Sequence, residues 1–206
     1  MRIDRPPPGE ELGAGAPSVP RASATVIVVR DGRADLEVLL VRRNPEQRFM
    51  GGAWVFPGGA TAAEDRDERA TAVRELAEEA GIVLEPGHEL VRFSRWITPA
   101  QVAVRFDTHF FVAEAPPGAS PVVDGGECVD WRWLAPAEAL RLGRLEELLL
   151  VFPTVKHLEQ LAEFASVAEL LAAARARRVA PVEPRVLVDG GVAHVLLPGE
   201  DGYDDA

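Results

Sequence analysis

The chain has 206 residues, 47% of them hydrophobic, which is enough for one domain with a proper core. Its formal net charge of −11 argues against a nucleic-acid partner, because phosphate contacts need clustered Lys and Arg side chains. The single cysteine excludes an internal disulfide framework, and no apolar run approaches the roughly 20 residues that span a bilayer. The N-terminus lacks a secretory apolar segment, so we expect a cytoplasmic protein with no membrane partner.

The N-terminal part of the chain predicts an arm followed by strands. Residues 1–22 are rich in proline, glycine and alanine and are expected to form a flexible or polyproline-like arm. Two apolar runs separated by Asp31-Gly32 predict a hairpin, and Pro57-Gly58-Gly59 predicts a tight turn after a short strand. The strands are expected at 24–29, 37–42 and 53–56.

The segment 68–80 predicts a helix that carries an acidic cluster. Glu75, Glu78 and Glu79 are three or four residues apart, so they are expected to converge on one face, with Cβ atoms roughly 5–6 Å apart. Such like charges destabilise a helix unless a positive group lies among them, and a hard cation, Mg²⁺ or Mn²⁺, can meet all three. The alternative is a solvated, charge-rich helix. The core-facing positions are expected to be Ala70, Val73, Ala77 and Ala80.

The rest of the chain predicts further strands and then helices. Pro86-Gly87 turns the chain after the acidic helix, and Pro136 takes a favoured first position of a later helix. Asp189-Gly190-Gly191 lies between two apolar runs and predicts a hairpin. The strands are expected at 90–98, 108–114 and 127–134, the helices from 136, at 154–164 and at 167–177, and the hairpin strands at 185–188 and 192–196.

The acidic helix and the turn before it resemble the signature of the nudix hydrolases, G-x5-E-x7-R-E-U-x-E-E-x-G-U, where U is a bulky aliphatic residue. Arg74 to Ile82 match its second half residue for residue. In the first half, the glutamate position counted from Gly59 holds Asp65, and one additional residue separates it from the arginine. The role of that position therefore falls to Asp65 or to its neighbour Glu64.

The resemblance implies a fold and a division of the chain. A nudix-type α/β/α sandwich with a mixed sheet is expected for residues 23–145. Residues 146–206 are expected to form a helical and hairpin extension packed on the same domain. This extension either covers the site or builds the contact of a possible homodimer.

The resemblance also implies a metal-dependent hydrolase of a small phosphorylated substrate, with Mg²⁺ or Mn²⁺ ions that bridge the attacking water and the phosphoryl oxygens. Glu75, Glu78 and Glu79 would supply ligands, and one of them or a loop acid would take the proton of the water. Glu127 is the candidate for a further ligand from a later loop; the alternative is a solvated acid at a strand start. Arg74 would orient the glutamates, because a guanidinium can hold a carboxylate with two parallel bonds.

Residues 39–59 resemble the coenzyme A diphosphatase branch of that family, including its peroxisomal-type relatives, which reads L-L-T-x-R-S-x3-R-x3-G-x3-F-P-G-G. Val41 replaces the threonine and Asn44 the serine. Arg43 and Arg48 place two guanidinium groups where they can bind the phosphates of coenzyme A; the alternative is a surface charge and a loop residue. The positions in register are Leu39, Leu40, Arg43, Arg48, Gly52, Phe56, Pro57, Gly58 and Gly59, the last two being substrate-binding candidates.

Three functions therefore compete. The first is a diphosphatase of coenzyme A or acyl-coenzyme A, in which Trp96 or Phe106 stacks on the adenine, unless these are core or rim aromatics. The second is the same chemistry on ADP-ribose, NADH, a nucleotide sugar, a nucleoside triphosphate or a dinucleoside polyphosphate. The third is a non-catalytic nudix-fold module that binds a ligand. The intact acidic cluster argues against the third, because a pure binder need not keep mutually repelling acids together.

Overall fold

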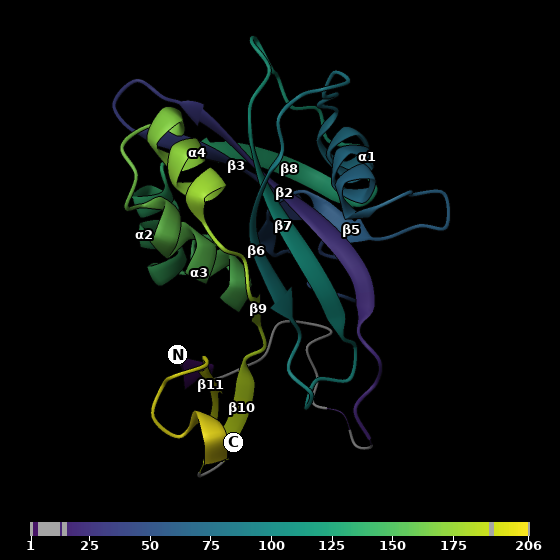
Figure 1. Ribbon diagram of the computed structural model, residues 1–206, viewed down its shortest axis with the longest axis vertical. Helices are drawn as coiled ribbons and strands as arrows, with labels where there is room; N and C mark the ends of the chain where they lie inside the picture. The colour runs from purple at the N-terminus through teal and green to yellow at the C-terminus, as the bar shows by residue number, and fades with distance from the viewer. Residues whose placement is uncertain (1, 4–12, 14–15, 190–191, 206) are drawn as a thin grey trace.

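The computed structural model describes residues 2–3, 13, 16–189 and 192–205, and the account below refers to these residues. A mixed sheet forms the centre of the molecule (Figure 1). Helix α1 (Glu68–Ala80) lies on one side of the sheet, and α2 (Pro136–Arg144), α3 (Phe152–Leu161) and α4 (Val167–Ala176) lie on the other. The expected α/β/α sandwich is confirmed. Within the described part of the chain, no helix has the length and apolar character needed to cross a membrane.

The central sheet has the strand order β4-β3-β2-β7-β6-β9, with β5 paired to β2 and β8 paired to β3. The predicted hairpin is the antiparallel β2–β3 pair, in which Val29 lies opposite Val38. On its other edge β2 pairs in parallel with β7, from Arg21 opposite Phe106 to Val29 opposite Glu114, and these two strands form the middle of the sheet. The strands are β2 (Arg21–Asp31), β3 (Leu36–Arg43), β4 (Trp54–Val55), β5 (Gly58–Ala60), β6 (Val91–Ile97), β7 (Phe106–Glu114), β8 (Cys128–Leu134) and β9 (Pro181–Val182).

The sheet separates two apolar cores, because alternate side chains of a strand point to opposite faces. Val26 and Val28 of β2 face α1, whereas Ile27 and Val29 pack toward α2, α3 and α4. All four are fully buried. Each face of the sheet is therefore covered, and a site can form only where a helix or loop leaves the sheet open.

Helix α1 begins and ends where its capping residues place it. The Asp67 side chain accepts a hydrogen bond from the Ala70 N–H (2.8 Å), and Gly81 follows the helix with a φ of 64°, in the left-handed region that glycine tolerates. The rotation of the helix differs from the prediction, however. Its buried stripe is Ala72, Leu76 and Ala80.

Of the four expected core positions, Ala80 is buried and Val73 is partly buried and packs against the same core, whereas Ala70 and Ala77 are only partly buried and are not part of it. Glu75 and Glu79 lie beside the apolar stripe and are themselves buried, with exposed fractions of 7% and 2%. From polarity alone, these acids were expected on the face opposite the core. Glu79 instead contacts the Gly58 N–H of β5 and the Arg43 side chain of β3.

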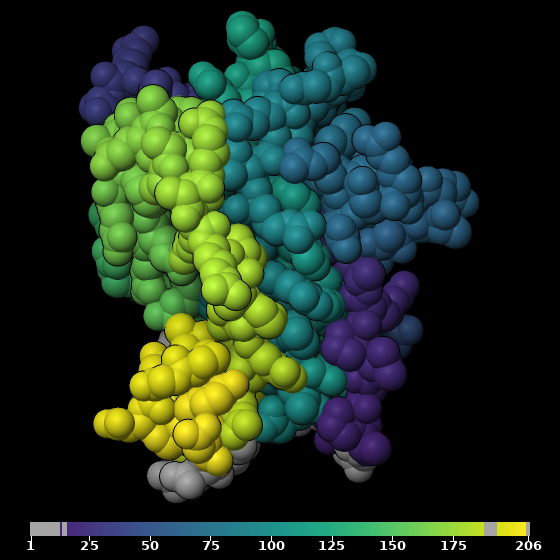
Figure 2. Space-filling view, in the orientation of Figure 1, coloured from purple at the N-terminus to yellow at the C-terminus, as the bar shows by residue number. Residues whose placement is uncertain are grey.

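The C-terminal extension and β1 (Arg2–Ile3) form a small three-stranded sheet of order β1-β11-β10 below the main sheet (Figures 1 and 2). The predicted hairpin is confirmed as β10 (Arg185–Asp189) and β11 (Val192–Leu196), although its turn residues Gly190 and Gly191 lie outside the described residues. A 3₁₀ turn, Tyr203–Asp205, follows.

The N-terminal arm is described only in part. Residues 1, 4–12 and 14–15 lie outside the described residues, and the expected flexibility there stays a prediction. Arg2–Ile3 form β1, which pairs with β11, and β2 already begins at Arg21. Between them, the Gly13 N–H donates to the Gln101 carbonyl (2.7 Å), so part of this segment contacts the loop between β6 and β7.

Candidate active site

Three carboxylates meet at the sheet-facing side of α1. Glu75 and Glu79 lie one helical turn apart, and Glu127 reaches them from the loop before β8. Carboxylate oxygens of the three side chains lie within 4.8 Å of one another. Both helical acids are buried and Glu127 is exposed, so the cluster is open to solvent on one side. Three oxygen donors at this spacing suit a hard divalent cation.

The backbone of β5 shapes this cluster. The Gly58 N–H donates to Glu79 Oε2 (2.9 Å), and the Arg43 guanidinium lies 3.4 Å from Glu79 Oε1. A Cβ atom at Gly59 would stand 2.5 Å from Glu75 Oε1, so a larger residue at this position would displace the carboxylate from its place beside the strand. The segment predicted as a tight turn is therefore a short strand, paired with β2, that brings main chain against both helical acids.

Burial and mutual repulsion raise the affinity of the cluster for protons. Burial raises the pKa of Glu79 to about 7, and the nearby Glu75 and Glu127 carboxylates act in the same direction, against the Gly58 N–H and Arg43. Burial also raises the pKa of Glu75. A carboxylate that is costly to ionise alone is stabilised by a bound cation, so the donor set fits Mg²⁺ or Mn²⁺.

Arg74 connects the loop before α1 to the acids of the helix. Its Nε and Nη2 donate to the two oxygens of Asp65 at 3.1 and 2.8 Å, and Nη1 donates to Glu75 (2.8 Å) and Glu78 (2.7 Å). The hydrogen bonds from Arg74 hold the pKa of Asp65 well below its usual range. Asp65 and Glu64 were the two candidates for the glutamate position of the signature. Asp65 pairs with Arg74, whereas Glu64 is exposed.

The expected convergence of three helical glutamates is found for two of them. The Glu78 side chain is 59% exposed and lies against Arg74, outside the group of three. The reason is rotational: successive helical residues are about 100° apart, so Glu78 is turned away from Glu79, whereas residues four apart overlap. Glu127 takes the third place.

The loop that carries Glu127 is organised by Asp124, a residue that the sequence analysis missed. Its carboxylate accepts hydrogen bonds from the backbone N–H groups of Gly126, Glu127 and Cys128 at 3.1, 2.9 and 2.9 Å. Asn44 also holds this loop, because its backbone N–H donates to the Glu127 carbonyl (2.8 Å). The run Asp124-Gly125-Gly126 is a turn signal that could have indicated this arrangement.

A cavity of about 690 Å³ adjoins the acidic cluster. Of the predicted substrate-binding residues, Arg43, Gly58, Gly59, Trp96 and Phe106 line it together with the three acids. Arg48 is exposed and is not among the lining residues. The aromatic candidates are engaged with protein: Trp96 packs edge-on against Phe152, and Phe106 against Phe49. The lining residues that the sequence did not single out include Phe49, Met50, Val102, Phe152, Pro184 and Val195.

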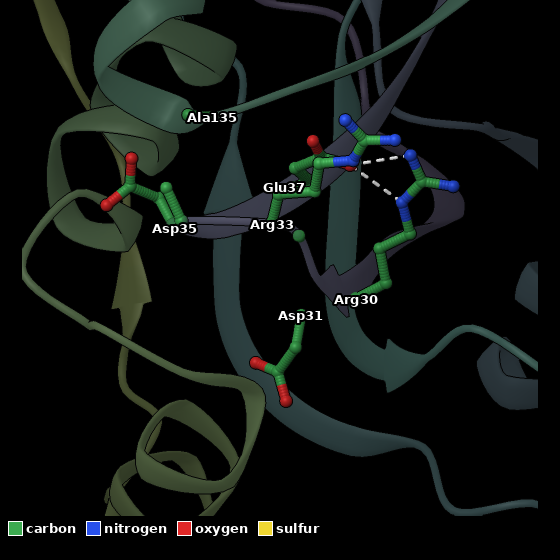
Figure 3. Close-up of a pocket in the computed structure, with 8 residues that line it drawn as sticks. Arg30, Asp31, Arg33, Asp35, Glu37 and Ala135 are labelled. Carbon is green, nitrogen blue, oxygen red and sulfur yellow. Dashed lines mark hydrogen bonds and ion pairs between the residues drawn. The ribbon is translucent and has the colours of Figure 1, made fainter.

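A second hollow, of about 580 Å³, lies at the β2–β3 turn (Figure 3). Three of its charged side chains, Arg30, Asp31 and Glu37, contact other parts of the protein. Arg30 donates to Glu37 at 2.7 Å, as the dashed lines in Figure 3 show, and Asp31 accepts from the Val167 N–H at the start of α4 (2.9 Å). None of the three clustered acids lines it, so the larger cavity is the candidate site.

Known proteins resemble this chain both in sequence and in fold. The profile of the NUDIX domain matches residues 19–152. Human acyl-coenzyme A diphosphatase NUDT19 is 25% identical over an alignment of 272 residues, which covers 81% of this chain and 72% of the human protein. A NUDIX hydrolase from Alicyclobacillus acidocaldarius superposes with a TM-score of 0.67 at 28% identity, over 75% of this chain and 96% of that one.

A further solved structure shows the fold alone. The NUDIX domain of Shewanella oneidensis NrtR, determined in complex with ADP ribose, superposes with a TM-score of 0.56 at 22% identity. The superposition covers 71% of this chain and 88% of that domain.

Proposed function

Because this chain belongs to the nudix family of hydrolases, which act on phosphoanhydride bonds, we propose that its substrate is coenzyme A or an acyl-coenzyme A. Hydrolysis of the diphosphate would release 3′,5′-ADP and the phosphopantetheine half, with its acyl group where one is present. The observation that carries the proposal is the juxtaposition of the acidic cluster and Arg43 with a large, mainly apolar cavity. The similarity to a human acyl-coenzyme A diphosphatase supports it.

The acids of the cluster have a defined part in this reaction. Glu75, Glu79 and Glu127 would hold Mg²⁺ or Mn²⁺, which supplies charge neutralisation for the diphosphate and an acidified water. Glu78 is a candidate ligand for a further ion, because it shares Arg74 Nη1 with Glu75 and is open to solvent. One of these carboxylates takes the proton of the attacking water.

The arginines have separate parts. Arg43 lines the cavity beside Glu79, with only 17% of its side chain exposed, so its guanidinium is available to a phosphoryl oxygen at the cluster. Arg74 is saturated by Asp65, Glu75, Glu78 and the Ala60 carbonyl, and its part is to position the acids. Arg48 is exposed in the loop after β3, where it can meet the 3′-phosphate outside the cavity.

The test is product analysis over a panel of diphosphates, with Mg²⁺ and with Mn²⁺. Coenzyme A, acyl-coenzyme A, ADP-ribose, NADH and a dinucleoside polyphosphate are compared at equal concentration. The expected result is metal-dependent release of 3′,5′-ADP from coenzyme A or its thioesters at the highest kcat/KM. If coenzyme A is inert while ADP-ribose or a dinucleotide is hydrolysed, the substrate proposed here is wrong.

A further inference from the structure

The small C-terminal sheet contributes one apolar face to the cavity. Val186 of β10 lies directly opposite Val195 of β11, and Ala193 precedes Val195 by two residues. Residues two apart on a strand, and directly paired residues of neighbouring strands, share a face of a sheet. Val186, Ala193 and Val195 all line the cavity, as does Pro184 just before β10.

Polar contacts hold this sheet in place. Arg105, only 8% exposed, donates to Glu183 at 2.7 Å and to the Thr98 carbonyl at 3.0 Å, so it links the C-terminal segment to the loop between β6 and β7. The Tyr203 hydroxyl donates to the Glu183 carbonyl (2.8 Å). Strand β9 also pairs with β6 just before the small sheet begins. The C-terminal segment is therefore built into this part of the molecule.

The distribution of charge in the cavity limits what it can hold. Among its lining residues, the charged side chains are Arg43, Glu75, Glu79 and Glu127, and these belong to the acidic cluster and its neighbour. The remaining lining residues are apolar or carry neutral hydroxyls, with Trp96, Phe152 and the small sheet among them. A nucleotide 3′-phosphate buried among them would lack a cation, which is costly. An apolar chain would gain from the same surroundings.

We propose that the cavity face of β10 and β11 is the acyl-binding wall of the site, so that the enzyme selects acyl-coenzyme A over free coenzyme A. This inference rests on the proposed function. With the diphosphate at the acidic cluster, the acyl-pantetheine half enters the cavity and the adenosine half projects outward. Val186, Ala193 and Val195 are then residues that determine specificity.

The test is calorimetric binding of coenzyme A and its acetyl, butanoyl, hexanoyl and octanoyl thioesters to the full chain, with Ca²⁺ in place of Mg²⁺ or Mn²⁺. A hard cation then still neutralises the three acids, and the ligand is checked to be intact after each titration. Affinity is expected to rise with chain length, by about two- to fourfold for each added methylene, until the cavity is filled. In Ala193→Phe the added ring occupies the cavity, and the rise of affinity with chain length is expected to disappear. A flat series in the wild type overturns the inference.

A matched control uses the same strand and the same replacement. His194 is next to Ala193 but does not line the cavity, so His194→Phe is expected to keep the wild-type dependence on chain length. Loss of that dependence in both variants, or in neither, contradicts the proposed wall. If Ala193→Phe fails to fold, Val186→Ala provides the second variant: it enlarges the cavity and should move the optimum to a longer chain, and an unmoved optimum counts against the wall.

The two proposals fail in different ways. If affinity rises with acyl-chain length but no 3′,5′-ADP is released, the proposed reaction is wrong and the acyl-binding wall is supported. If coenzyme A is hydrolysed but affinity does not depend on acyl-chain length, the proposed reaction is supported and the acyl-binding wall is wrong.

Discussion

Arg74 and Asp65 face each other through two parallel hydrogen bonds, from Nε to Oδ1 at 3.1 Å and from Nη2 to Oδ2 at 2.8 Å. Asp65 also accepts from the Ala62 N–H (2.9 Å) and the Thr71 hydroxyl (3.0 Å), and only 6% of its side chain is exposed. The pair therefore ties the loop between β5 and α1 to the helix that carries the acids.

Loss of this pair should lower the stability of the protein. In Arg74→Ala the buried Asp65 carboxylate loses its charged partner, and we expect the free energy of unfolding to fall by about 2–3 kcal/mol in urea titrations. Arg141→Ala is the matched control, because Arg141 makes a similar two-bond contact with Glu138 on an exposed face of α2. The control is expected to lose less than about 1 kcal/mol. Equal losses in the two variants would contradict the structural role of Arg74.

Removal of one charge from the acidic cluster should separate catalysis from folding. In Glu79→Gln we expect kcat to fall by at least about 10²-fold and Mn²⁺ binding to weaken, because a carboxylate ligand is lost. The metal-free variant should be at least as stable as the wild type at pH 8, since burial of an ionised Glu79 is costly, as its raised pKa shows. Metal titration and urea unfolding measure the two effects. Glu163→Gln, at an exposed position, is the control, and full activity in Glu79→Gln would defeat the assignment.

The two arginines near the site should respond differently to the 3′-phosphate of the substrate. Coenzyme A and dephospho-coenzyme A differ only in that group. Arg48→Ala is expected to raise KM for coenzyme A by about tenfold, the usual scale of a lost charge-assisted hydrogen bond, with a smaller change for dephospho-coenzyme A. Arg43→Ala should impair both substrates alike, because Arg43 lies beside Glu79. Equal effects of Arg48→Ala on the two substrates would remove Arg48 from the site.

His157 should make stability depend on pH. It is fully buried, Nδ1 lies 2.6 Å from the Pro153 carbonyl and Nε2 lies 2.6 Å from the Ser94 hydroxyl. Because a carbonyl only accepts, Nδ1 carries the proton and Nε2 accepts from Ser94. Burial is the main reason that the pKa of His157 falls from 6.5 to about 4.

The sign of the effect follows from proton binding. Between pH 6.5 and 4 the unfolded chain binds a proton at this histidine that the folded chain does not, so stability is lost as pH falls through that window. The contribution is about 3 kcal/mol when fully expressed. Urea unfolding at pH 7.5 and 4.5 should therefore show a smaller acid loss for His157→Gln than for the wild type. Parallel losses in the two proteins would show that His157 is not the group responsible.

Local sequence determined much of this protein. The limits of α1 follow from the Asp67 and Gly81 caps, and both hairpins follow from apolar runs around turn residues. The four-residue spacing of Glu75 and Glu79 is sufficient to predict that they lie side by side on the helix. The resemblance to the nudix family was visible in the same local stretch, because Arg74 to Ile82 match the second half of the signature, and the domain profile over residues 19–152 shows the family.

Tertiary structure alone decided which groups complete the site. Glu127 joins the helical acids, Glu78 leaves them, and Val195 reaches the cavity from the far end of the chain. The orientation of α1 about its own axis, which buries Ala72 and Leu76 against the sheet, did not follow from the pattern of polar residues along the helix. The physical reason is that spacing along a helix or strand fixes only which side chains share a face. What that face meets depends on strand register and packing between segments distant in sequence, which local patterns do not encode.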